Sequence, residues 1–214
     1  MPKIDEKKLV QAIQQGDKIA LAQLLEHYQQ RLYNIILRMV YNRDDALELA
    51  QDTMVKIVEH ISDFNGQSKI STWMIRIAMN LSISHLRKRK LRNAMSLDQP
   101  FNGQNDQSAS LKQQIVDQME PGPSQNVQNN EMLALLQQAI HQLEQDFKAV
   151  LVLRDIDQMD YTQIANVLNI PVGTVKSRLF RARLALRQQM LKNQQPPTDS
   201  PEHAFVYQNG DPND

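Results

Sequence analysis

The chain has 214 residues with 24 basic and 24 acidic side chains, so its formal net charge at pH 7 is zero. Its 41% hydrophobic content is enough to bury a core, and the lack of cysteine excludes disulfides and thiolate metal sites. No apolar run is long enough for a membrane span or a signal peptide, and six scattered glycines exclude the usual phosphate-binding loops. We therefore expect a cytoplasmic protein with no membrane insertion and no nucleotide cofactor.

Basic residues are concentrated in two blocks. Residues 61–92 carry seven basic residues and one acidic residue, and residues 161–192 carry six basic residues and no acidic one. A solvated face is the commoner explanation for a single basic cluster. Two blocks that each end a helical segment favour two contacts with one polyanion.

The segment 45–61 is predicted to form an amphipathic helix, because its apolar residues recur at helical spacing. The other side carries Asp45, Glu48 and Asp52 beside Lys56. This acidic ridge does not favour DNA, so it is either simply solvated or docks a basic protein partner. The expected buried positions are Ala46, Leu47, Ala50, Met54, Ile57, Val58 and Ile61.

The next segment combines a polar loop, an apolar helix and a basic end. Residues 64–68 are predicted to be a loop, Ser71 or Thr72 is a candidate helix cap, and residues 73–83 are apolar nearly all round, as in a buried helix. The basic tract 87–92 is either a solvated helix end, where the macrodipole favours positive charge, or a contact for phosphates. Trp73 is either a core residue or a platform that stacks on an unpaired base.

Composition divides the chain into two domains, a segment that connects them and a C-terminal tail. In residues 93–130, 23 of 38 residues are Gln, Asn, Ser, Pro or Gly, which is typical of a flexible linker. The tail 193–214 has four prolines, four acidic residues and no basic one, and is expected to be disordered. We therefore place domains at 1–92 and 131–192, the second beginning with a helix over 131–143.

The second domain carries the pattern of a helix-turn-helix motif. Asp160 and Gln163 have the spacing of a capping box, Asn169 tolerates a left-handed turn, and Pro171 is suited to start the next helix. In that helix Val175, Leu179, Ala182 and Leu186 fall on one side. The opposite side is basic and includes Phe180, with no acidic residue in the segment to neutralise it. This face is either that of a solvated helical hairpin or that of a recognition helix in a DNA major groove.

With these motifs, the chain resembles bacterial RNA polymerase sigma factors of the extracytoplasmic-function (ECF) group over about residues 9–92 and 131–190. In the first domain the resemblance lies in Leu32-Tyr33, Asp45-Ala46, Gln51-Asp52-Thr53, Phe64, Ser71-Thr72-Trp73, Ile77-Ala78, Asn80 and the basic end at Arg87. In the second it lies in residues 151–154, Tyr161, Ile164-Ala165, the run 171–179 and Arg181-Ala182-Arg183. The sequence departs from the family pattern at Leu47, Met54, Ser84, Glu144-Gln145, Gln163 and Asn169.

The resemblance implies an all-α fold with a region 2 helical bundle and a region 4 helix-turn-helix domain. It implies no catalysis and no cofactor or metal. The implied partners are promoter DNA and core RNA polymerase, through the clamp helices of its β′ subunit and the flap of its β subunit. An anti-sigma factor, which could hold the chain at the inner membrane, is a further possible partner.

The resemblance also assigns candidate residues to three surfaces. For the promoter −35 element they are Thr174, Lys176, Ser177, Arg178, Phe180, Arg181 and Arg183. For the −10 element they are Phe64, Asn65, Gln67, Ser68, Trp73, Asn80, Arg87, Lys88, Arg89 and Lys90. For polymerase they are Asp45, Glu48, Gln51, Asp52 and Lys56.

Two other classes of function stay open from the sequence. A helix-turn-helix repressor or activator would bind a duplex operator without polymerase, and would need a dimer interface or a ligand pocket. A helical-bundle metalloenzyme would use His27, Glu48, Asp52 and His60, although the Glu-x-x-His spacing of such sites is missing.

Overall fold

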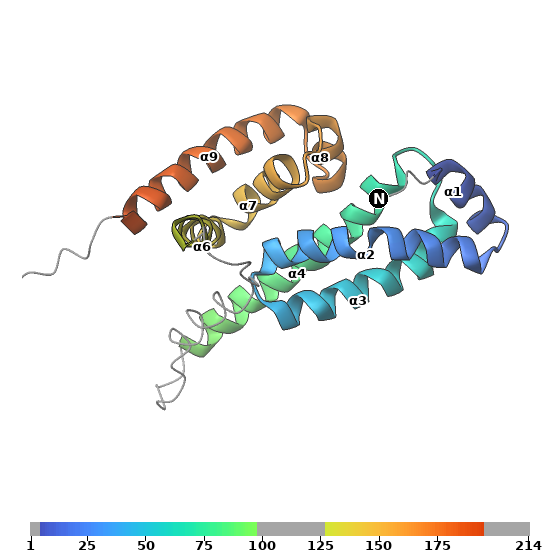
Figure 1. The fold of residues 1–214 in the computed structure, drawn as a ribbon, viewed down its shortest axis with the longest axis horizontal. Coiled ribbons are helices and arrows are strands. Elements are labelled where there is room, and N and C mark those ends of the chain that lie inside the picture. The colour runs from blue at the N-terminus through green and yellow to red at the C-terminus, as the bar shows by residue number, and fades with distance from the viewer. Residues whose placement is uncertain (1–4, 98–126, 195–214) are drawn as a thin grey trace, which may run out of the picture.

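The computed structural model describes residues 5–97 and 127–194, and within these ranges it is helical with connecting loops and no strand. The all-α prediction is therefore confirmed. Figure 1 shows the two domains as two groups of helices that lie against each other. None of the helices described is long and apolar enough to cross a membrane.

The first domain consists of four α-helices. They are α1 (Glu6–Gln14), α2 (Lys18–Val40), α3 (Arg43–His60) and α4 (Ile70–Leu97), with a 3₁₀ turn at Ile61–Asp63 after α3. Asp5, Asp17 and Asn42 begin the first three helices, since each side chain accepts a hydrogen bond from a backbone N–H of the first turn. Helices α2, α3 and α4 pack against one another and bury the core of this domain.

The buried face of α3 differs from the one predicted. Leu47 and Val58 are 46% and 47% exposed, whereas Leu49 and Thr53 are buried. Helix α3 packs against both α2 and α4, and its buried face is the side that these two helices cover. Spacing alone identified an amphipathic helix, but not the side that its neighbours would cover.

Helix α4 begins and ends outside its predicted limits. It starts at Ile70, so Ser71 and Thr72 lie buried in its first turn and do not cap it. It continues to Leu97, and α6 begins at Val127, so residues 93–97 and 127–130 of the predicted linker are helical. The remainder of that linker, and the tail from residue 195, lie outside the described residues.

The second domain consists of α6 (Val127–His141), α7 (Gln145–Leu151), a π-helix (Val152–Ile156), α8 (Tyr161–Leu168) and α9 (Val172–Gln194). The segment 150–153, predicted as buried helix, is helical and almost fully buried. The side chain of Lys148 is also buried, and its Nζ donates a 2.9 Å hydrogen bond to the carbonyl oxygen of His141 at the end of α6.

The helix-turn-helix motif forms as its local signals predict. Asp160 and Gln163 form both hydrogen bonds of a capping box, and Asn169 adopts the left-handed conformation with φ of 53°. Pro171 precedes α9, accepting at its carbonyl from the N–H groups of Thr174 and Val175. On α9, Val175, Leu179 and Ala182 are buried, with Leu186 packed at the edge of the core.

The two domains share an extended interface. Helix α8 packs against α4, and the π-helix packs against α2 (Figure 1). The buried side chains of both domains belong to one continuous cluster. The chain is therefore folded with its second domain closed onto the first.

Candidate promoter and polymerase surfaces

The first half of α9 presents an exposed basic surface with an aromatic residue in its centre. Lys176, Ser177 and Arg181 are exposed, and Phe180 is 73% exposed, while Thr174 is half-buried. Such a large apolar side chain has no packing role in the described structure. A face of cations around an exposed ring is suited to base edges, phosphates and thymine methyl groups in a major groove.

Two arginines of α9 have acidic partners, which sequence reasoning missed. The guanidinium of Arg178 lies 2.6 Å from the Asp146 carboxylate on α7. Arg183 donates two hydrogen bonds to Asp155 of the π-helix, at 3.1 and 2.6 Å. The segment 161–192 itself contains no acidic residue, but the fold brings Asp146 and Asp155 from outside it to pair with two of the arginines. Both arginines are held in fixed orientations at the edge of the exposed surface.

The loop after α3 has an exposed tip above a buried base. Phe64 is only 6% exposed and packs on the half-buried Trp73, with ring centroids 5.7 Å apart at an angle of 57°. Asn65 and Gln67 are exposed, and Gly66 allows the turn between them with φ of +73°. The two aromatic rings thus support the loop, while its polar side chains are free to contact a ligand.

A cleft of about 270 Å³ opens beside this loop and joins it to α4. It is lined by Asp63, Phe64, Asn65, Gln67, Ser68, Trp73, Arg76 and, from α8, Asn166. The predicted loop residues and Trp73 are therefore brought together. Asn80 is exposed on α4 but does not line this cleft.

The basic end of α4 is only partly free. Arg87, Lys88 and Lys90 are exposed. Arg89 is half-buried and its guanidinium lies 3.7 Å from the Asp45 carboxylate, which also lies 3.2 Å from Nε2 of His85. Arg89 and Asp45, which the sequence assigned to two different partners, therefore contact each other.

The exposed side of α3 combines acidic and apolar residues. Glu48, Gln51, Asp52 and Lys56 are all exposed. Next to them Leu47, Val55 and Val58 are 46–55% exposed. Sequence reasoning assigned Leu47 and Val58 to the core, because an apolar residue at helical spacing is normally buried, and it did not assign Val55 to either face. Apolar side chains interleaved with charges are typical of a protein interface.

The structure gives no support to the residues considered for a metal site. Within residues 5–97 and 127–194, no three His, Cys, Asp or Glu side chains come together as metal ligands would. His60 instead lies 3.1 Å from Asp63, on the exposed turn after α3.

Family models match both domains of the chain. The model for sigma-70 region 2 matches residues 24–92, and the model for sigma-70 region 4 matches residues 133–186. The first range contains the predicted polymerase and −10 residues, and the second contains the helix-turn-helix motif. A repressor or activator with a helix-turn-helix domain alone does not account for the first match.

Characterised relatives match over nearly the whole chain. The ECF RNA polymerase sigma factor SigW of Bacillus subtilis is 35% identical over 186 residues, covering 86% of this chain and 96% of that protein. The RNA polymerase sigma-H factor of Pseudomonas aeruginosa is 33% identical over 189 residues, covering 85% and 91%. Both alignments span the two domains and the segment between them.

Solved structures show the same fold. The sigma factor RpoE of Bartonella quintana, solved with the anti-sigma factor NepR, has a TM-score of 0.58, 24% identity and coverage of 81% of this chain and 98% of that one. CnrH, solved with the cytosolic domain of CnrY, has a TM-score of 0.61, 20% identity and coverage of 89% and 99%. Matching regions 2 and 4 and relatives of full length together show that the chain belongs to the ECF group of the sigma-70 family, the sigma factors that direct RNA polymerase to promoters.

Proposed function

We propose that the chain divides promoter recognition between its two domains and does no chemistry of its own. The outer face of α3 docks on core polymerase, α4 with the preceding loop reads the −10 element, and α9 reads the −35 element. The observation that carries this division is the position of the two basic surfaces on separate domains, apart from the acidic and apolar face of α3.

For the −35 element, α9 enters the major groove by its first half. Lys176 and Arg181 contact base edges or phosphates, and Phe180 contacts thymine methyl groups. Arg178 and Arg183 reach the DNA from positions fixed by Asp146 and Asp155. Thr174 and Ser177 complete the set at the N-terminal end of the helix.

For the −10 element, the loop and α4 hold an opened strand. Asn65, Gln67 and Ser68 at the loop, with Asn80 on α4, contact an unpaired base, and Trp73 supports the edge of the melted region. Arg87, Lys88 and Lys90 hold backbone phosphates. Arg89 joins them only when it leaves Asp45.

For polymerase, the exposed α3 side chains supply a negative surface with apolar contacts. Glu48, Gln51 and Asp52 face basic helices of the β′ clamp, and Lys56 lies at the edge of the contact. Asp45 supports this surface through its pairs with His85 and Arg89. The second domain docks on the flap of the β subunit.

We infer further that the chain acts in the cytoplasm and is itself subject to an anti-sigma factor, which holds it at the inner membrane. Support for the anti-sigma partner comes from the sigma factor RpoE of Bartonella quintana, which was determined in complex with the anti-sigma factor NepR.

The energetics suit a protein that acts only together with polymerase. If about five cations contact phosphate, the slope of log K against log salt is roughly −4 to −5, so each domain alone binds weakly at cellular salt. Binding to polymerase makes the second contact effectively intramolecular and adds avidity.

Run-off transcription with core polymerase and a library of promoters tests the proposal. We expect transcripts only when this chain is added, from templates that share one −10 and one −35 sequence. Failure to initiate on any template would contradict the proposal. A specific footprint by the chain without polymerase would instead favour a conventional repressor or activator.

A further inference from the structure

An asparagine is followed directly by a glycine at the tip of the loop before α4. Asn65 and Gly66 are both exposed, and Gly66 has the left-handed conformation, with φ of +73°. A residue with a Cβ rarely adopts this conformation, so the turn favours glycine at this position. The residue that follows Asn65 is therefore set by the shape of the loop.

The side-chain amide of an asparagine can be attacked by the backbone nitrogen of the next residue. A glycine leaves this nitrogen unhindered because it has no side chain. Apart from the chain neighbours, no atom lies within 4 Å of the position that a Cβ of Gly66 would occupy. Among the described residues, the N–H of Gly66 donates to no acceptor, so the nitrogen is free to lose its proton and attack.

The loop also holds the amide of Asn65 ready for attack. The N–H of Gln67 donates a 3.2 Å hydrogen bond to Oδ1 of Asn65, which keeps the side-chain amide close to the backbone of Gly66. The same hydrogen bond stabilises the negative charge that develops on Oδ1 when the carbon is attacked. The base of the loop is fixed, since the carbonyl of Phe64 accepts a 3.1 Å hydrogen bond from Gln14. The reacting groups are thus held together at an exposed tip above a fixed base.

We propose that Asn65 is a site of spontaneous deamidation, through which the −10 surface is inactivated as the protein ages. The nitrogen of Gly66 forms a bond to Cγ of Asn65, the bond from Cγ to Nδ2 breaks, and ammonia leaves with the proton that the backbone nitrogen gave up. Water then opens the resulting cyclic imide at either carbonyl, which gives an aspartate or an isoaspartate. The co-reactant is water, and no oxidation or reduction takes place.

Either product places a negative charge on a loop that is proposed to contact DNA. The functional consequence rests on the proposed assignment of Asn65 to the −10 element. The new carboxylate repels the phosphate backbone and has no N–H group to donate to a base. Isoaspartate also inserts a carbon atom into the main chain. Loss of one hydrogen bond alone lowers affinity roughly 2- to 10-fold, so a deamidated chain should recognise the −10 element less well.

The reaction can be measured on the full chain without DNA or polymerase. The purified chain is incubated folded, and unfolded in guanidinium chloride, at neutral and at mildly alkaline pH, and is then digested with trypsin. Residues 57–69 form a tryptic peptide in which Asn65 is the one asparagine. Mass spectrometry detects the conversion of amide to carboxyl in this peptide, and enzymatic methylation of isoaspartate identifies the second product.

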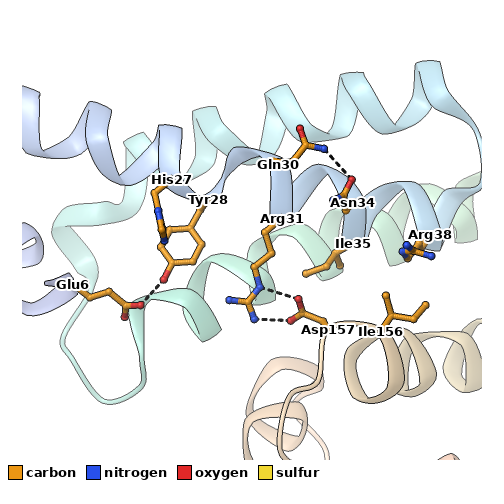
Figure 2. Close-up of a pocket in the computed structure, with 10 residues that line it drawn as sticks. All are labelled: Glu6, His27, Tyr28, Gln30, Arg31, Asn34, Ile35, Arg38, Ile156 and Asp157. Carbon is orange, nitrogen blue, oxygen red and sulfur yellow. Dashed lines mark hydrogen bonds and ion pairs between the residues drawn. The ribbon is translucent and has the colours of Figure 1, made fainter. Parts of the chain in front are cut away.

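Asn34 is a matched control within the same chain. It is exposed on α2, three residues after Arg31, which pairs with Asp157 (Figure 2). The next residue, Ile35, has a branched side chain that hinders attack, and its N–H lies within α2, where the helix engages it in a backbone hydrogen bond. The tryptic peptide 32–38 contains this asparagine alone, so both sites are followed in one digest.

We expect the folded chain to convert Asn65 to both products with time, while Asn34 stays unconverted. Conversion should be faster at the higher pH, because the attacking nitrogen must lose its proton. The variant Asn65→Gln should not react, since attack would have to close a larger and less favourable ring. Conversion in the unfolded chain alone would overturn the proposal, because it would show that the fold protects this amide, and an intact Asn65 in both samples would also overturn it.

Run-off transcription tests the functional consequence. Asn65→Asp reproduces one product and should lower initiation roughly 2- to 10-fold, whereas Asn34→Asp makes the same charge change on α2 and should initiate as the parent does. Circular dichroism verifies that each variant is folded. The aged parent should lose activity in step with the conversion of Asn65, and aged Asn65→Gln should keep the activity of its own fresh sample.

Full activity of Asn65→Asp would overturn the inactivation. Failure of the fresh parent to initiate on any template would instead overturn the proposed function, and the deamidation measurements do not depend on that result.

Discussion

The rings of Tyr41 and His141 stack across the interface between the two domains, with centroids 4.6 Å apart and planes inclined by 26°. Tyr41 ends α2 and His141 ends α6, so the stack joins two helix ends. Burial, together with the nearby positive charges of Lys148 and Arg89, lowers the pKa of His141 to about 4. Because the closed chain holds this imidazole neutral, its protonation opposes closure.

We predict that the closed form weakens between pH 6.5 and pH 4. A folded-state pKa below the usual 6.5 means that the contribution of His141 is fully present above pH 6.5 and is lost as the pH falls toward 4. The loss is on the order of 1–3 kcal/mol. Lys148, whose pKa burial lowers to about 8, stays protonated throughout this window. The distance between labels on the two domains, followed from pH 7.5 to pH 4.5, measures the effect.

The variant His141→Gln separates this titration from that of the other histidines and of the carboxylates. It keeps a planar polar side chain but cannot become charged in this range, so its closed population should depend less on pH than that of the parent. The same pH profile in both proteins would contradict the role of His141.

Local features of the fold, which depend on residues close together in the sequence, could be predicted from the sequence. The capping box of Asp160 and Gln163 and the left-handed Asn169 depend on backbone geometry over a few residues. The buried side of α9 also follows from spacing. Helices α6, α7 and α8 all pack against this helix and cover its apolar side. The exposure of Leu47 and Val58 could not be predicted, since it depends on where α2 and α4 contact α3.

The sequence predicted which residues lie on the basic surfaces, but not which of them form ion pairs. Lys176, Phe180 and Arg181 are exposed because helical spacing places them on the side of α9 opposite the core. The pair of Arg31 and Asp157 joins residues 126 positions apart, and nothing in either local sequence indicates the other. Arg178 and Asp146 likewise belong to different helices, so a count of charge within one segment could not show that they neutralise each other.

The substitution Arg178→Ala should lower promoter-specific transcription by about 1–3 kcal/mol of recognition, or roughly 5- to 150-fold, through the −35 element. Affinity for core polymerase should not change, because Arg178 lies on the basic face of α9 that is assigned to DNA and not on a surface assigned to polymerase. Run-off transcription on templates with and without a −35 element measures the effect. Arg187→Ala, at an exposed position further along α9, is the control. An unchanged −35 preference in Arg178→Ala would refute the assignment.

The substitution Asp52→Lys should weaken association with core polymerase. It reverses a charge in the centre of the exposed α3 surface, where the proposed partner is basic, and like charges repel across an interface. A pull-down with core polymerase at several salt concentrations measures the loss, which should be largest at low salt. Glu26→Lys makes the same charge change at an exposed position of α2 and should bind as the parent does. Wild-type affinity in Asp52→Lys would defeat the docking assignment.

The substitution Asp160→Ala should destabilise the second domain by about 1 kcal/mol, because it removes the side chain that accepts a 2.8 Å hydrogen bond from the N–H of Gln163 at the start of α8. The midpoint of thermal or urea unfolding measures the loss. Thr162→Ala, at an exposed position in the same helical turn, shortens a side chain without removing the cap and should change the midpoint less. Because α8 also packs on α4, the loss should extend to the closed form, and labels on the two domains should report wider separation in Asp160→Ala than in Thr162→Ala. Equal stability of these two variants would show that the capping box does not stabilise α8.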